Sequence, residues 1–127
     1  RKKYLHIYGN DWPTRDGTAV RDYIHIMDLA KAHSKSLDYL FKNDKVYLNL
    51  NIGTEIGTTV LELVRNFEKV NKCFIPFKIV PRRNGDVPVL IAKSSRARFL
   101  LDWSPDYSLK DICQHTWNWI FFNKDVN

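Results

Sequence analysis

The feature that most constrains the fold of this chain is its alternation between two hydrophobic periodicities. Short runs with a period of two, typical of half-buried strands, lie at residues 4–8, 20–26, 46–52 and 76–80. Longer runs repeat their apolar residues at helical spacing, at residues 29–43, 60–70, 95–101 and 109–121. Strands that alternate with helices predict an α/β arrangement. No linker long enough to divide the 127 residues separates them.

Polar residues at the expected helix starts support these boundaries. Ser, Thr and Asp are preferred N-caps because their side-chain oxygens accept a hydrogen bond from a free backbone N–H of the first turn. Thr59 and Glu62 have the spacing of a capping box. The other expected caps are Asp28, Ser94 or Ser95, and Ser108.

Composition narrows the kinds of partner. The net charge of +6 favours an anionic partner, which leaves nucleic acid, acidic lipid and a phosphorylated small molecule open. The four histidines lack metal-ligand spacing, and Cys73 and Cys113 lack CxxC spacing, so we expect reduced thiols and no metal. No run is apolar enough to predict a signal peptide or a membrane span, which predicts an intracellular protein. Because the chain begins at Arg1 and its one methionine is Met27, we expect it to begin within a longer protein or after processing.

Two groups of arginines are candidate anion ligands. Arg82 and Arg83 lie in a proline-bounded loop, residues 81–88, together with Asp86. Arginine binds phosphate bidentately, and a nearby carboxylate can accept bonds from sugar hydroxyls. A solvated turn with one internal Arg–Asp ion pair explains this loop equally well. Arg21 shares a strand face with Tyr23, which indicates an edge position or a cleft.

Other catalytic and binding motifs are missing. The Gly53–Gly57 loop before a helix has neither GxGxxG nor P-loop spacing, so a plain turn is favoured over a phosphate loop. The chain has no GxSxG, no distinct carboxylate pair and no RNA-binding motif. The aromatic residues of the last third fall at core-like helical positions: Trp103, Trp117, Trp119 and Phe121. A small phosphorylated ligand is therefore favoured, with a basic nucleic-acid-binding module and an interaction domain as alternatives.

The longest motif resembles a signature of the UDP-glucose 4-epimerases, a family of the extended short-chain dehydrogenase/reductase group. It reads Tyr-Gly-Asn-Asp-Trp-Pro-Thr-Arg-Asp-Gly-Thr-Ala-Val-Arg-Asp-Tyr-Ile-His-Ile-Met-Asp-Leu over residues 8–29. Residues 47–53, 59–64, 81–86 and 116–119 also agree with the family in order. The resemblance implies the smaller C-terminal substrate-binding domain of a cytoplasmic, homodimeric, NAD-dependent isomerase of galactose metabolism. Such enzymes interconvert UDP-glucose and UDP-galactose through a 4-keto sugar.

The resemblance also implies roles for individual residues. Arg21 and Arg83 match the pyrophosphate ligands, and Asp86 matches the acceptor for the ribose hydroxyls. The strand around His6, Ile7 and Tyr8 matches the segment whose backbone lies along the uracil. Leu90 matches a position that lines the hexose pocket. UDP-hexose is therefore the expected partner. Binding to nucleic acid or to a membrane is not expected.

Several family features are missing from this chain. Neither the NAD-binding GxxGxxG nor the catalytic Tyr-xxx-Lys pair is present, so residues 1–127 are expected to hold no catalytic and no cofactor-binding residue. The resemblance then implies that the NAD-binding domain precedes residue 1, and that this chain alone binds UDP-sugar weakly or not at all and catalyses nothing. A related dehydratase or uronate epimerase stays an alternative. Leu90 replaces an aromatic residue found in hexose-restricted members, and Lys93 replaces a frequent Asp. The smaller Leu90 suggests tolerance of an N-acetylated hexose.

Overall fold

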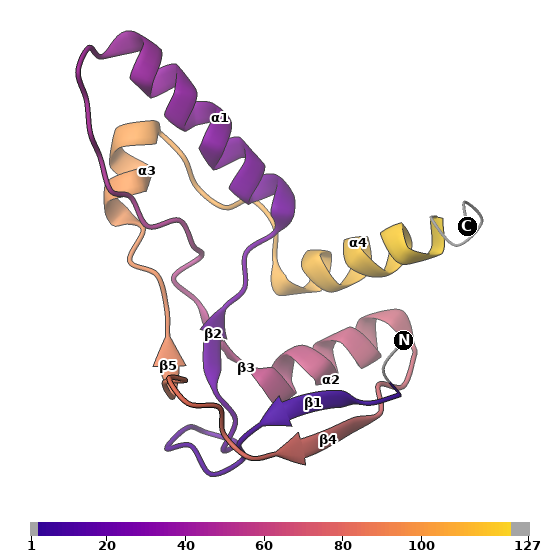
Figure 1. Cartoon of the computed structure of the whole chain (residues 1–127). Coiled ribbons are helices and arrows are strands. Elements are labelled where there is room, and N and C mark those ends of the chain that lie inside the picture. The colour runs from indigo at the N-terminus through magenta and orange to yellow at the C-terminus, as the bar shows by residue number, and fades with distance from the viewer. Residues whose placement is uncertain (1–2, 123–127) are drawn as a thin grey trace.

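The computed structural model describes residues 3–122 and confirms the α/β class (Figure 1). Its elements follow the order β1 (Leu5–Tyr8), β2 (Val20–Asp22), α1 (Ile26–Lys42), β3 (Gly57–Thr59), α2 (Val60–Asn71), β4 (Phe77–Val80), β5 (Val89–Leu90), α3 (Ser95–Leu101) and α4 (Leu109–Phe122). The short strands β3 and β5 were not predicted. Each is two or three residues long, which is too short to show a periodicity.

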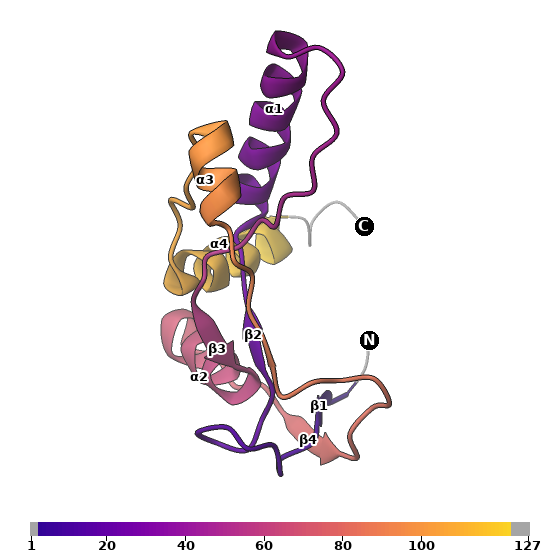
Figure 2. The ribbon, with the colours of Figure 1, turned by 90° about the vertical axis from the view of Figure 1, so that its left-hand side faces the viewer.

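The strands form two small sheets at one end of the molecule. β1 pairs with β4 in parallel, with Ile7 opposite Ile79. β2 is the centre of a three-stranded sheet, antiparallel to β3 and parallel to β5. Figure 2 shows α1 and α3 at the opposite end, with β2 running between the two regions. β2 therefore joins the sheet end to the helical end.

A small core holds the helical end together. Ala32 of α1, Ala97 and Leu101 of α3, and Trp103 form one buried cluster. Trp103 is 2% exposed, and its indole Nε1 donates to the carbonyl oxygen of Asp28 at 3.0 Å. The indole thus fills the core and ties the chain after α3 to the start of α1.

The start of α1 differs from the prediction. The strand ends at Asp22, and His25 is the N-cap, its Nδ1 accepting a hydrogen bond from the backbone N–H of Met27 at 3.0 Å. Asp28 lies inside the first turn, fully buried, and its carboxylate accepts from the backbone N–H groups of Asp106 and Tyr107. The prediction of Asp28 as the cap was wrong because its carboxylate binds the backbone of a loop that is distant in sequence. Local spacing cannot show such a contact.

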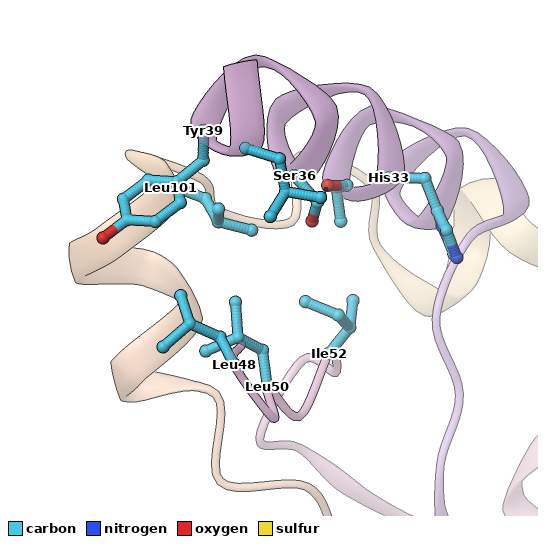
Figure 3. Close-up of a pocket in the computed structure, with 9 residues that line it drawn as sticks. His33, Ser36, Tyr39, Leu48, Leu50, Ile52 and Leu101 are labelled. Atoms are coloured by element: carbon cyan, nitrogen blue, oxygen red, sulfur yellow. Dashed lines mark hydrogen bonds between the residues drawn. The ribbon is translucent and has the colours of Figure 1, made fainter. Parts of the chain in front are cut away.

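The predicted strand at residues 46–52 is wrong within the described chain. These residues form no ladder and run extended beside α1 and α3. In Figure 3, Leu48, Leu50 and Ile52 face residues of α1 and Leu101 of α3 across a cavity of about 240 Å³. Their alternation is real, but a strand also needs a neighbouring backbone to pair with, and residues 3–122 supply none here.

The remaining helices begin where predicted. Thr59 and Glu62 form the capping box of α2, with both reciprocal bonds present. Ser108 caps α4, where its Oγ accepts from the N–H of Asp111 at 3.3 Å. Ser94 precedes α3, although its hydroxyl donates to the carbonyl oxygen of Gly53 instead of capping the helix.

Several residues predicted to be buried are exposed. Trp119 of α4 is 68% exposed and Phe41 of α1 is 86% exposed, and Leu37 and Leu40 are exposed too. The helical spacing was right, but spacing alone does not show which helix positions other elements bury. Within the same residues, no helix is long and apolar enough to cross a membrane.

Candidate functional site

An open cavity of about 270 Å³ lies where β1, β2, the start of α2 and the loop after β4 meet. Six of the seven residues predicted to bind substrate line this cavity, although they come from three separate parts of the sequence. Its lining is His6, Ile7, Tyr8, Ala19, Arg21, Tyr23, Val60, Arg83 and Asp86. The fold therefore brings two guanidinium groups and one carboxylate together around one opening.

β1 forms one wall of the cavity. Ile7 is 1% exposed and anchors the strand, whereas His6 and Tyr8 are more accessible. Successive side chains of a strand point to opposite faces, so His6 and Tyr8 share a side, and their rings meet edge to face at 6.3 Å. Two adjacent aromatic rings beside charged groups offer a surface on which a flat ring can stack.

Arg21 lies on β2 and is held by backbone oxygens. Its Nη1 donates to the carbonyl oxygens of Val20 at 2.7 Å and Val87 at 3.0 Å. These two bonds use one nitrogen of the guanidinium fork, which can present further N–H groups to an anion.

Leu90 lies outside this cavity, in contrast to the other six predicted residues. It pairs with Arg21 across the β2–β5 ladder and lines a neighbouring cavity of about 470 Å³. Arg21 lines both cavities.

Arg83 and Asp86 form the ion pair that was one of the two explanations of their loop. Arg83 Nε lies 3.0 Å from Asp86 Oδ2, and the Arg83 guanidinium lies 4.4 Å from the centre of the Tyr8 ring. The pair nevertheless lines the cavity, and the Arg83 side chain is 59% exposed. The Arg83–Asp86 ion pair therefore does not remove either residue from the lining of the cavity.

The sequence reasoning assigned no role to Tyr23, Ala19 or Val60, which also line the cavity. Tyr23 carried a usable signal, because it lies two residues beyond Arg21 and was predicted to share its strand face, although β2 ends at Asp22. Burial raises the pKa of the Tyr23 phenol, and the nearby charge of Arg21 partly opposes that shift. The phenol therefore stays protonated at neutral pH and can donate a hydrogen bond.

The Gly53–Gly57 loop is the plain turn that the sequence favoured. Its backbone N–H groups at Thr54 and Glu55 each donate to the Asp22 carboxylate at 3.0 Å. An internal carboxylate therefore occupies the donors that a phosphate would need.

This fold and site define a class of protein. The family model described as GDP-mannose 4,6 dehydratase matches residues 1–116, and the chain belongs to this family, within the short-chain dehydrogenase/reductase group. More particularly, its relatives are UDP-glucose 4-epimerases. UDP-glucose 4-epimerase 3 of Oryza sativa subsp. japonica is 46% identical over 120 residues, which cover 94% of this chain and 32% of the relative. The chain thus spans about a third of the length of such relatives.

Solved structures agree with this assignment. The UDP-glucose-4-epimerase from Stenotrophomonas maltophila, with bound NAD and formylated UDP-arabinopyranose, superposes with a TM-score of 0.91 at 40% identity. That match covers 99% of this chain and 37% of the other. The Bifidobacterium longum UDP-glucose 4-epimerase, in complex with NAD+ and UDP, gives a TM-score of 0.89 at 38% identity, covering 96% and 36%.

The described residues do not fit a dinucleotide. Such a site needs a glycine-rich turn between a parallel strand and a helix of a large sheet. Residues 3–122 contain only sheets of two and three strands, and the Gly53–Gly57 turn holds Asp22. No step that involves NAD is therefore assigned to these residues.

Proposed function

We propose that the protein to which this chain belongs interconverts UDP-glucose and UDP-galactose, and that this chain binds the UDP portion of the substrate. The observation that carries the proposal is the cavity that collects Arg21, Arg83 and Asp86. Arginine forks bind phosphate oxygens through paired, charge-assisted hydrogen bonds, and a carboxylate accepts bonds from vicinal hydroxyls. A diphosphate joined to a ribose presents both kinds of group.

The proposed roles follow the arrangement of the lining. Arg21 and Arg83 hold the pyrophosphate, and Asp86 accepts the ribose hydroxyls. The backbone of His6, Ile7 and Tyr8 runs along the uracil, with the rings of His6 and Tyr8 beside it. Since Arg21 lines both cavities, a pyrophosphate bound by Arg21 is proposed to place the attached sugar near the cavity that Leu90 lines.

NAD, the catalytic tyrosine and its lysine are proposed to come from an NAD-binding domain that precedes residue 1. The relatives are about three times as long as this chain, which supports that division of labour. A homodimeric assembly, a cytoplasmic location and a place in galactose metabolism follow from the same resemblance and stay predictions. Under this proposal, residues 1–127 bind and orient the substrate and perform no proton or hydride transfer.

A chimaeric enzyme tests the proposal. The aligned C-terminal segment of the Bifidobacterium longum enzyme is replaced by this chain, and conversion of UDP-galactose to UDP-glucose is measured. We expect activity from the chimaera and none from the 127-residue chain with added NAD. In the chimaera, Arg83→Ala should lower kcat/KM roughly tenfold or more, because a charge-assisted phosphate contact is lost. Arg96→Ala, which removes an exposed charge on α3, is the matched control.

Three results would count against the proposal. One is a folded, NAD-loaded chimaera that is inert toward both sugars. Another is epimerisation by the chain alone. The third is turnover of UDP-glucuronate in place of UDP-galactose, which would support the uronate alternative. Salt-sensitive retention on DNA without any response to UDP would instead support nucleic-acid binding.

Sugar specificity is proposed to depend on Leu90. Leu90 is 61% exposed and lines the larger of the two cavities to which Arg21 contributes, which supports room for an N-acetyl group. In the chimaera, Leu90→Tyr should lower turnover of UDP-N-acetylglucosamine relative to UDP-glucose. Equal ratios before and after the substitution would exclude this role of Leu90.

A further inference from the structure

The segment between β1 and β2 contains a motif to which the proposed function gives no role, and it contacts the arginine loop. The Arg82 guanidinium lies 3.8 Å from the centre of the Trp12 ring. Its Nε donates to Asp11 Oδ1 at 2.7 Å, and its Nη2 donates to the Asp11 carbonyl oxygen. Asp11, Trp12 and Arg82 are called the clamp below.

Trp12 is a fixed partner for this contact. It is 8% exposed, its Nε1 donates to the carbonyl oxygen of Tyr8 at 3.2 Å, and its backbone N–H donates to Gly17 at 3.0 Å. Gly9 leaves the space that the clamp needs: a Cβ there would lie 2.7 Å from Trp12 Nε1 and 2.8 Å from Arg82 Cγ. The clamp is therefore built into the turn that ends β1.

The clamp separates two neighbouring arginines by function. Arg82 is turned toward Trp12 and Asp11, whereas Arg83 lies over Tyr8 and lines the cavity. Each guanidinium has its own aromatic ring and its own carboxylate, which keeps the two positive charges apart. Arg82 does not line the cavity, so its influence on a ligand is indirect.

The loop has few other attachments on this side. All its residues from Pro81 to Gly85 are exposed, and a Cβ on Gly85 would meet no atom within 4 Å. A loop with so few packed contacts opens easily unless specific bonds hold it. The Arg82 contacts supply such bonds one residue before Arg83.

We propose that the clamp of Asp11, Trp12 and Arg82 is a positioning device that holds the 81–86 loop so that Arg83 and Asp86 face the nucleotide diphosphate. This inference rests on the proposed function. Arg82 is a positioning residue and makes no contact with the ligand. Its planar fork both stacks on Trp12 and bonds Asp11, a combination that lysine cannot reproduce.

The first test needs no ligand. In the 127-residue chain, the NMR signal of the Arg83 Nε–H reports its bond to Asp86, and 15N relaxation reports order in the loop. Arg82→Ala and Arg82→Lys should both broaden that signal and lower the order parameters of the loop. Arg96→Ala should change neither. An unchanged Arg83 signal in both Arg82 variants overturns the positioning role of the clamp, irrespective of the UDP-binding results.

The second test is a double-mutant cycle of UDP affinity in the chimaeric enzyme, measured by NMR titration. We expect Arg82→Ala and Arg82→Lys each to weaken binding roughly fivefold to tenfold, a typical effect of losing a stacked, hydrogen-bonded guanidinium. In the Arg83→Ala background, Arg82→Ala should have almost no further effect, because it acts through Arg83.

The outcomes separate this inference from the proposed function. Additive losses show that Arg82 binds the anion directly and overturn the positioning role, as does full rescue by lysine. Wild-type affinity in Arg82→Ala overturns it as well. If UDP in large excess shifts no signal even in the unsubstituted chimaera, the nucleotide-binding role itself fails. The ligand-free test of the clamp is independent of that failure.

Discussion

Replacement of Asp22 is the perturbation whose consequence the structure defines best. Its carboxylate joins three segments: Oδ1 accepts from the N–H and hydroxyl of Thr54, and Oδ2 accepts from the N–H groups of Glu55 at 3.0 Å and Ala92 at 3.3 Å. Asp22 is thus the link between β2, the turn before β3 and the end of β5. Gly53 packs so closely that a Cβ there would lie 2.5 Å from Asp22 Oδ2.

The expected cost follows from those four bonds. A hydrogen bond to a charged group contributes about 1.5–3 kcal/mol, and partial exposure lets water replace some of that energy. In Asp22→Asn, either orientation of the amide brings its NH2 group against at least one backbone N–H. We therefore expect Asp22→Asn to lower the free energy of unfolding by about 2–3 kcal/mol and Asp22→Ala by about 3–4 kcal/mol.

Urea unfolding of the 127-residue chain, followed by circular dichroism at neutral pH, measures both variants. Asp38→Asn is the matched control, since it removes the same charge from an exposed position of α1 and should change stability by less than about 0.5 kcal/mol. If Asp22→Asn falls within the range of that control, the carboxylate does not hold the three segments together and the reasoning is refuted.

Three further predictions concern helix starts. Thr59→Ala should lower the free energy of unfolding by about 1–2 kcal/mol, whereas Thr59→Ser, which keeps the capping oxygen, should cost much less in the same urea titration. The hydrogen bond from Arg15 holds the pKa of Glu62 below its ordinary value of 4.5, so this pair stabilises the fold at neutral pH and its contribution is lost as the pH falls through the lowered pKa. Glu62→Gln should therefore flatten the fall in stability between about pH 6 and about pH 3, and an unchanged slope would contradict this. His25→Ala should speed amide hydrogen exchange at Met27 and cost about 1 kcal/mol, because the cap of α1 is lost; unaltered exchange would argue against that cap.

The part of the fold that the sequence predicted well is the part governed by local chemistry. The capping box at Thr59 and Glu62 and the cap at Ser108 each join residues three positions apart, so their spacing is enough to find them. Asp28 failed as a predicted cap because its partners, Asp106 and Tyr107, are nearly eighty positions away. Spacing along the chain carries no information about such a contact.

For the candidate site, residue chemistry pointed to Arg21, Arg83 and Asp86, and the resemblance added the β1 residues. The sequence allowed an Arg–Asp ion pair in this loop as one of two explanations, but it did not reveal which arginine would form it, or that Arg82 would stack on Trp12. Those outcomes depend on β1 and β4 lying side by side, which brings the loop after β4 next to the turn after β1. No pattern within either segment contains that pairing.

By itself, the sequence determined the α/β class, the helix starts set by neighbouring residues, and the arginines and carboxylate that are candidate ligands of an anion. Tertiary structure alone decided which of those groups share a cavity, that Arg82 stacks on Trp12 outside that cavity, and that residues 46–52 form no strand within the described chain. The physical reason is that periodicity and capping depend on bonds between close neighbours in sequence. A ladder, a buried carboxylate or a stacked guanidinium instead depends on a partner that only the folded chain brings into reach.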